Sequence, residues 1–122
     1  MRRSELLQWF GLFGGAAAWT AQHGALFFIS SARCNPAGVR WAFGMTGWQI
    51  GVTVAAAMVA LAAEWASVVT ALRTREFEHD GPPPLGRIYF FSLAASAGNV
   101  LFLGAILLNG IGAGWWSSCA TS

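Results

Sequence analysis

The sequence lacks lysine altogether, and charged side chains make up only 10% of its 122 residues. Soluble domains carry roughly 25% charged residues, so this deficit argues against a soluble protein. The seven cationic residues are all arginines scattered along the chain, which argues against a nucleic-acid-binding surface, because such surfaces need clustered positive charge. With 56% hydrophobic residues, the composition predicts a membrane protein.

Three long apolar windows account for most of the chain. They cover about residues 6–30, 46–72 and 88–113, and each meets the length of about 20 residues that a membrane-crossing helix requires. The connector 73–87 between the last two contains a Pro-Pro-Pro run, which cannot continue a helix. We therefore expect an all-α membrane protein with three transmembrane helices, built as a single domain over residues 1–122.

The first window follows an N-terminal pair of arginines, so a cleavable signal peptide is an alternative interpretation, with residues 16–18, all alanine, as the cleavage region. Its apolar part is long for a signal peptide, which favours a retained anchor. Five of the seven arginines flank the N-terminus and the connector 73–87, whereas Arg33 and Arg40 follow the first window. Because positive residues near helix ends stay in the cytoplasm, we expect a cytoplasmic N-terminus and a periplasmic or extracellular C-terminus.

The chain has two cysteines, Cys34 just after the first window and Cys119 just after the third. The expected topology places both in the same outer compartment, where oxidising conditions favour a disulfide. A zinc site is a weaker interpretation, because two cysteines do not complete the usual four-ligand shell.

Polar residues inside the apolar windows are the candidate contact positions between helices. In the second window, polar and small residues recur at helical spacing along one face; they are Gln49, Thr53, Ala56, Ala60, Glu64, Ser67 and Ala71. Glu64 is the acidic residue deepest in any window, and a charged group there costs ~2.5 kcal/mol or more. It is therefore interpreted as a neutral carboxyl hydrogen-bonded to another helix, as a proton-handling group, or as a contact with a charged partner.

The other windows supply further candidates. The first contains Gln22 and His23, and the third contains Ser96 and Asn99 on one side and Asn109 near its outer end. Glycines are expected to let helices approach closely, both in the segment GLFGG at residues 11–15 and at Gly98 and Gly104.

Histidines raise the question of haem or metal binding. His23 has aromatic neighbours four residues before and after it, which favours a packing role, and Met45 is the second axial ligand that a haem there would need. His79 lies among acidic residues of the connector, which is typical of a solvated loop, with metal binding as the alternative.

The segment GLFGGAAAW in the first window, Cys34 after it and the ending LLNGIGAGWWSSC resemble small three-helix membrane proteins of bacteria that are encoded beside haem-copper cytochrome c oxidases. Relatives of that kind often have a proline before the terminal cysteine, where this chain has Ser118. The resemblance implies an accessory subunit of a respiratory complex in the bacterial inner membrane, which binds larger membrane subunits and lipid and has no cofactor of its own.

Two other functions stay open. One is a small oligomeric transporter or proton-conducting component that uses Glu64, and the other is a haem-bearing membrane anchor that uses His23. The sequence contains no nucleophile, Walker or dinucleotide-binding motif, so we expect no catalytic activity of its own.

The disulfide is directly testable. Mass analysis of the non-reduced protein should show the peptides of Cys34 and Cys119 linked, with the loss of two hydrogens. Free thiols at both positions would contradict the disulfide and weaken the expected topology.

Overall fold

The computed structural model describes residues 2–33, 45–77 and 85–115. These residues form three long helices, α1 (Arg2–Arg33), α2 (Met45–Thr74) and α3 (Leu85–Trp115), and a short 3-10 helix, η1 (Arg75–Phe77), directly after α2. No strand occurs in these ranges, which confirms the all-helical prediction. The helices are longer at both ends than the apolar windows, and part of the predicted connector 73–87 is helical. Cys34, Cys119 and His79 lie outside the described residues.

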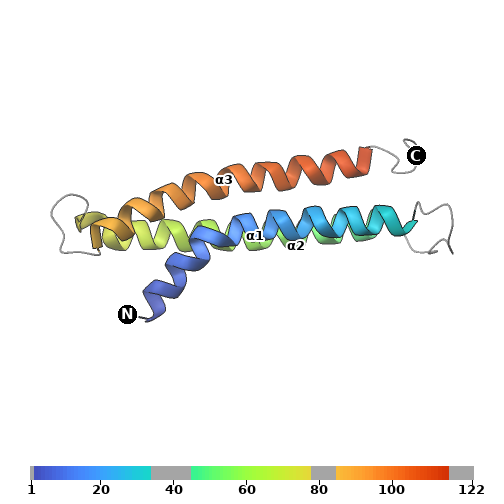
Figure 1. Ribbon diagram of the computed structural model, residues 1–122. Helices are drawn as coiled ribbons and strands as arrows, with labels where there is room; N and C mark the ends of the chain where they lie inside the picture. The colour runs from blue at the N-terminus through green and yellow to red at the C-terminus, as the bar shows by residue number, and fades with distance from the viewer. Residues whose placement is uncertain (1, 34–44, 78–84, 116–122) are drawn as a thin grey trace.

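The three helices lie side by side, and each packs against the other two (Figure 1). Successive helices run in opposite directions. The N-terminus and the junction between α2 and α3 are therefore at one end of the bundle, while α1 and α3 both finish at the other end.

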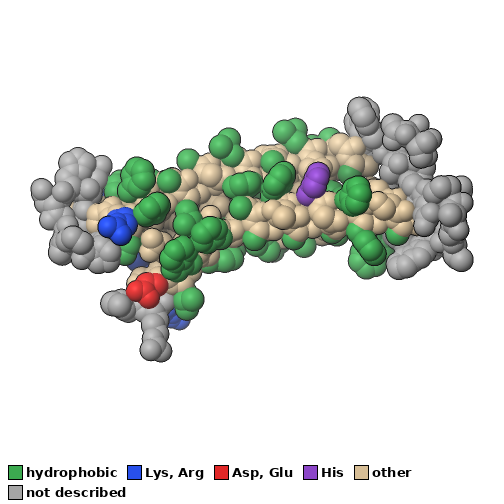
Figure 2. Space-filling model, in the orientation of Figure 1, with side chains coloured by type: hydrophobic (Ala, Val, Ile, Leu, Met, Phe, Trp, Pro, Cys, Tyr) green, Lys and Arg blue, Asp and Glu red, His purple; other side chains and the backbone are tan. Residues whose placement is uncertain are grey.

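Two of the helices are long and apolar enough to cross a membrane, over Gly47–Thr74 of α2 and Gly86–Ala113 of α3. Only 22% of the most apolar stretch of each is buried inside the bundle, so most of its apolar side chains face outward, and Figure 2 shows such side chains along the length of one face. The third predicted span, α1, does not meet the same criterion. The polar side chains of Gln22 and His23 in its middle lower its hydropathy.

Small side chains form the centre of the bundle. Ala18 from α1, Ala56 and Ala60 from α2 and Ile106 from α3 are all buried and pack as one cluster. Alanine lets two helix backbones come close, and close approach is how helices gain packing energy where lipid offers no hydrophobic driving force.

The segment GLFGG of α1 lies against both other helices. A Cβ atom added at Gly11 would be 2.5 Å from Ser67 Oγ, and one added at Gly14 would be 2.7 Å from Ala63 Cβ. In Figure 1 the N-terminal part of α1, dark blue, bends away from the bundle near this segment. Glycines and an inserted side chain are both known causes of such bends.

Close approach at Gly98 and Gly104, expected from the sequence, does not occur. An added Cβ would meet nothing within 4 Å at either position among the described residues. The glycine of α3 that permits close approach is Gly110, where an added Cβ would collide with Thr53 of α2.

This difference between glycines gives a matched pair of variants. Gly14→Ala should lower the free energy of unfolding by about 1–3 kcal/mol, because the methyl group overpacks against Ala63. Gly98→Ala should leave stability unchanged or raise it by up to ~1 kcal/mol, since alanine favours the helix and its methyl group would meet no described residue within 4 Å. Unfolding of both variants in mixed detergent, followed by circular dichroism, measures the two effects, and equal stabilities would contradict the packing at Gly14.

Candidate functional site

Most of the polar side chains singled out in the three apolar windows form two clusters and one pair. We call the first the Gln22 cluster, made of Gln22, Thr53, Asn109 and the carbonyl of Ile106. The second, the Asn99 cluster, consists of Asn99, Ser67 and the carbonyl of Gly11. The pair is Glu64 with Ser96.

Gln22 joins α1 to both other helices. Its side chain is 1% exposed, and its Nε2 donates to Thr53 Oγ1 of α2 at 3.1 Å and to the Ile106 carbonyl of α3 at 2.9 Å. Its Oε1 accepts a longer hydrogen bond, 3.4 Å, from Asn109 Nδ2 of α3. A buried amide with its polar atoms paired avoids the cost of burial in an apolar medium, so the cluster fixes the position of α1.

Asn99 plays the same part from α3. It is 2% exposed, and its Nδ2 donates to the Gly11 carbonyl of α1 at 2.7 Å and to Ser67 Oγ of α2 at 3.1 Å. The hydroxyl of Ser67 in turn donates to the Ala63 carbonyl at 3.0 Å. A Cβ at Gly15 would collide with Asn99 Oδ1, so a glycine at this position makes room for the amide.

Glu64 and Ser96 link α2 to α3. The Ser96 hydroxyl donates to Glu64 Oε1 at 2.5 Å, and both side chains are half-buried. The other carboxyl oxygen, Oε2, is enclosed and has no hydrogen-bond partner in the described part of the chain. Among the described residues, Glu64 Oε2 is therefore the one fully enclosed side-chain nitrogen or oxygen atom without a hydrogen-bond partner.

Several hydroxyls are satisfied within their own helix and make no link between helices. Thr70, Thr74 and Ser92 each donate to the carbonyl four residues earlier, at 2.7, 2.8 and 2.7 Å. Such bonds let a hydroxyl lie in an apolar bundle at low cost.

His23 and Gln49 belong to neither cluster. The His23 ring is exposed and stacks on Trp19 with 5.8 Å between ring centroids, and Trp19 lies 6.0 Å from Phe102 of α3. Gln49 is buried, 5% exposed, and makes no hydrogen bond to another described residue. The described ranges contain no group of three His, Cys, Asp or Glu side chains that could hold a metal ion. Met45 is described as part of α2, but its side chain is not, so its suitability as a haem ligand stays a prediction.

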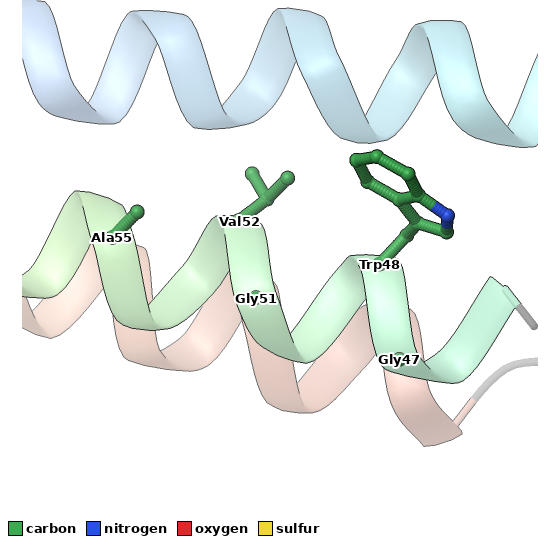
Figure 3. A pocket seen from close by; sticks show the side chains of 5 residues that line it. All are labelled: Gly47, Trp48, Gly51, Val52 and Ala55. Atoms are coloured by element: carbon green, nitrogen blue, oxygen red, sulfur yellow. The ribbon is translucent and has the colours of Figure 1, made fainter.

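A groove runs along the surface between α1 and α2. One part has a volume of about 550 Å³ and is lined by five residues of α2, drawn in Figure 3: Gly47, Trp48, Gly51, Val52 and Ala55. In that view the side chains of Trp48 and Val52 point from α2 toward α1.

A second part, of about 280 Å³, shares Val52 and Ala55 with the first. Its other lining residues come from both helices; they are Ala18, Ala21, Gln22, Ala25, Ala56 and Val59. Because the two parts share residues, we treat them as one surface, the α1–α2 groove.

The pairing of these residues was only partly foreseeable. Ser67 lies on the polar face predicted for α2, but its partner Asn99 could not be identified from spacing alone. The sequence indicates Asn109 as a possible bridge between helices, but it does not identify the partner, Gln22. The four-residue spacing of Gly47, Gly51 and Ala55 is the signal in the sequence for the α1–α2 groove.

Comparison of the chain with protein-family models, with curated proteins and with solved structures gives no match. The function is therefore argued from the residues and their geometry.

The hydrogen bonds differ in length and burial, so their loss should differ in cost. Asn99→Ala should lower the free energy of unfolding by about 1–3 kcal/mol, because it removes two interhelical bonds at a buried site. Asn109→Ala should cost less than ~1 kcal/mol, since it removes one long bond at a half-buried site. A larger loss for Asn109→Ala than for Asn99→Ala, in the same unfolding assay, would contradict the structure of the two clusters.

Proposed function

We propose that this protein is a non-catalytic accessory subunit of a membrane complex, and that it crosses the bilayer three times with its N-terminus in the cytoplasm. The observation that carries the proposal is the α1–α2 groove. It is an open, apolar surface lined mainly by small residues, and two of them, Gly47 and Gly51, make no close contact with another described helix.

The third span, α1, is supported by where its side chains lie. Its most polar interior residue, Gln22, is buried and paired inside the bundle, whereas Phe13, Phe27 and Phe28 are 55%, 71% and 65% exposed. A helix whose polar side chain is buried against its neighbours and whose phenylalanines are exposed can lie in lipid, although its average hydropathy is low.

The orientation is supported by the distribution of arginine. Arg3, Arg73, Arg75 and Arg87 belong to the end of the bundle where α1 begins and α2 meets α3. Arginine is retained on the cytoplasmic side, so that end faces the cytoplasm of a bacterial cell and the protein is a multi-pass component of the inner membrane.

The groove fits a membrane helix of a partner protein. Gly47, Gly51 and Ala55 follow one another at four-residue spacing on α2, and a Cβ added at either glycine would meet no described residue within 4 Å. Small residues at this spacing allow two helices to approach closely in lipid. None of the described helices packs closely against these two glycines, so we propose that a helix from another subunit does.

The complex that we propose is a respiratory one, most specifically a cytochrome c oxidase or a supercomplex that contains it. This part of the proposal rests on the resemblance of GLFGGAAAW, Cys34 and the C-terminal segment to small proteins encoded beside such oxidases. The polar groups are consistent with a supporting role, because most of them are paired within the bundle.

Proton conduction through Glu64 is the second candidate, and the unpartnered Oε2 is the observation in its favour. A path within one chain would have to pass the apolar layer of Ala18, Ala56, Ala60 and Ile106, which separates Glu64 from the Gln22 cluster. That layer favours the accessory role. The haem-anchor alternative would need a haem on the outer surface of α1, where His23 already stacks on Trp19.

Purification of the tagged full-length chain in mild detergent tests the accessory role. The wild-type protein should bring with it the haem- and copper-containing subunits of the oxidase, identified by mass and by absorption spectrum. Recovery of a well-folded chain without any such subunit would contradict the respiratory assignment.

A matched pair of variants tests the groove. Gly51→Leu should reduce the recovered oxidase subunits at least tenfold, because leucine fills the α1–α2 groove, whereas Gly104→Leu, also at an open position but on α3, should leave recovery unchanged. Both variants should retain the stability of the wild type. Full recovery with Gly51→Leu would show that the partner binds elsewhere, and equal losses in the two variants would contradict a groove-specific contact.

A further inference from the structure

The carboxyl group of Glu64 is paired on one side only. Ser96 occupies Oε1 at 2.5 Å, and Oε2 has less than 1 Å² of exposed surface and no hydrogen-bond partner among the described residues. In the described part of the chain, no other side-chain nitrogen or oxygen atom is both enclosed to this degree and without a hydrogen-bond partner.

A carboxylate in this position would be an uncompensated charge. Burial of an ionised carboxyl without a partner is far more costly than burial of a neutral one, and membrane-embedded acids are accordingly paired, hydrated or neutral. Because Oε2 has almost no accessible surface, a water molecule cannot reach it from outside the bundle.

No cation of this chain compensates Glu64 within the described ranges. On its own helix the nearest is Arg73, nine residues away, or about 13 Å along the axis. On α3, Arg87 lies nine residues before Ser96, or about 13 Å along the axis. The phenol of Tyr89 lies seven residues before Ser96, or about 10 Å along the axis. On α1, Arg3 and Glu5 lie in the part that bends away, and His23 adjoins the Gln22 cluster. The charged residues of η1, Arg75 and Glu76, follow the end of α2.

We propose that Glu64 and Ser96 form a proton-binding site, in which the carboxyl of the membrane-inserted protein holds its proton. A proton can bind to an enclosed oxygen because, unlike a metal ion or a water molecule, it needs no cavity beside that oxygen. The neutral acid has two arrangements that suit the geometry. Either Ser96 donates to Oε1 while the proton sits on Oε2, or the carboxyl O–H on Oε1 donates to the Ser96 hydroxyl.

This inference is independent of the proposed accessory role, because it concerns the isolated bundle. It also assigns Glu64 a different task from the residues of the two clusters. Those residues bind helices to one another, whereas Glu64 stores a proton at a depth where the rest of the described chain offers no relay to the Gln22 cluster.

Infrared spectroscopy of the purified full chain in lipid nanodiscs tests the site. The spectrum of the wild type minus that of Glu64→Gln, recorded at neutral pH, should contain the carbonyl stretching band of a protonated carboxyl group. Ser96→Ala should shift that band to higher frequency, because it removes the hydrogen bond at Oε1. If Glu64→Gln fails to fold, carbon-13 labelling of glutamate in the wild-type protein identifies the same band by its isotope shift.

Exposed carboxyls of the same chain are the matched controls. Glu5 and Glu76 are both exposed, so the differences obtained with Glu5→Gln and Glu76→Gln should lack the band of a protonated carboxyl group. A Glu64 difference spectrum that also lacks the protonated carboxyl band would overturn the proton-binding site, while leaving the accessory role untouched. A protonated band that Ser96→Ala does not shift would overturn the part assigned to Ser96.

Discussion

The hydrogen bonding of Asn99 is the interaction on which the arrangement of the helices depends. From α3 its amide donates to a backbone carbonyl of α1 and to a hydroxyl of α2, so one side chain sets the register of three helices. In lipid an amide without partners is costly, and the three helices cannot slide independently without exposing it. Gly11 and Gly15 are required nearby, because a side chain at either would collide with Ser67 or Asn99.

The Gln22 cluster repeats this principle farther along the bundle. Thr53 lies 14 residues before Ser67 on α2, which corresponds to about 21 Å along the helix axis, and alanine packing fills the interval. Two polar crossing points separated by an apolar layer fix both the position and the tilt of α1. The consequence for function is that polar side chains are mostly committed to the interior, while the outer surface offers apolar residues and the α1–α2 groove.

The existence and approximate bounds of the helices were predictable, because long apolar windows interrupted by arginine and proline leave few alternatives. The polar face of α2 was also predictable, since helical spacing alone places Thr53, Glu64 and Ser67 on one side. Their partners were not, because a contact between helices depends on the rotation and register of each, and these follow from packing rather than from spacing within one segment.

The contacts of the glycines were likewise not predictable from the sequence. Composition could not distinguish Gly110, where an added Cβ would collide with α2, from Gly98 and Gly104, where it would meet no described residue within 4 Å. The average hydropathy of α1 was also a poor guide to its environment, because it counts Gln22 as a polar residue and takes no account of its burial. The structure resolves both questions by showing which face of each helix is turned inward.

Gln22 and Asn99 tie α1 to the other two helices, and we propose that α1 therefore crosses the membrane with them. Hydrogen–deuterium exchange of the full chain in lipid nanodiscs tests this claim most directly. The account predicts that backbone amides of α1 beyond Gly15 exchange as slowly as those of α2 and α3. Exchange of these amides at the rate of a helix lying on the membrane surface, while α2 and α3 stay protected, would contradict it.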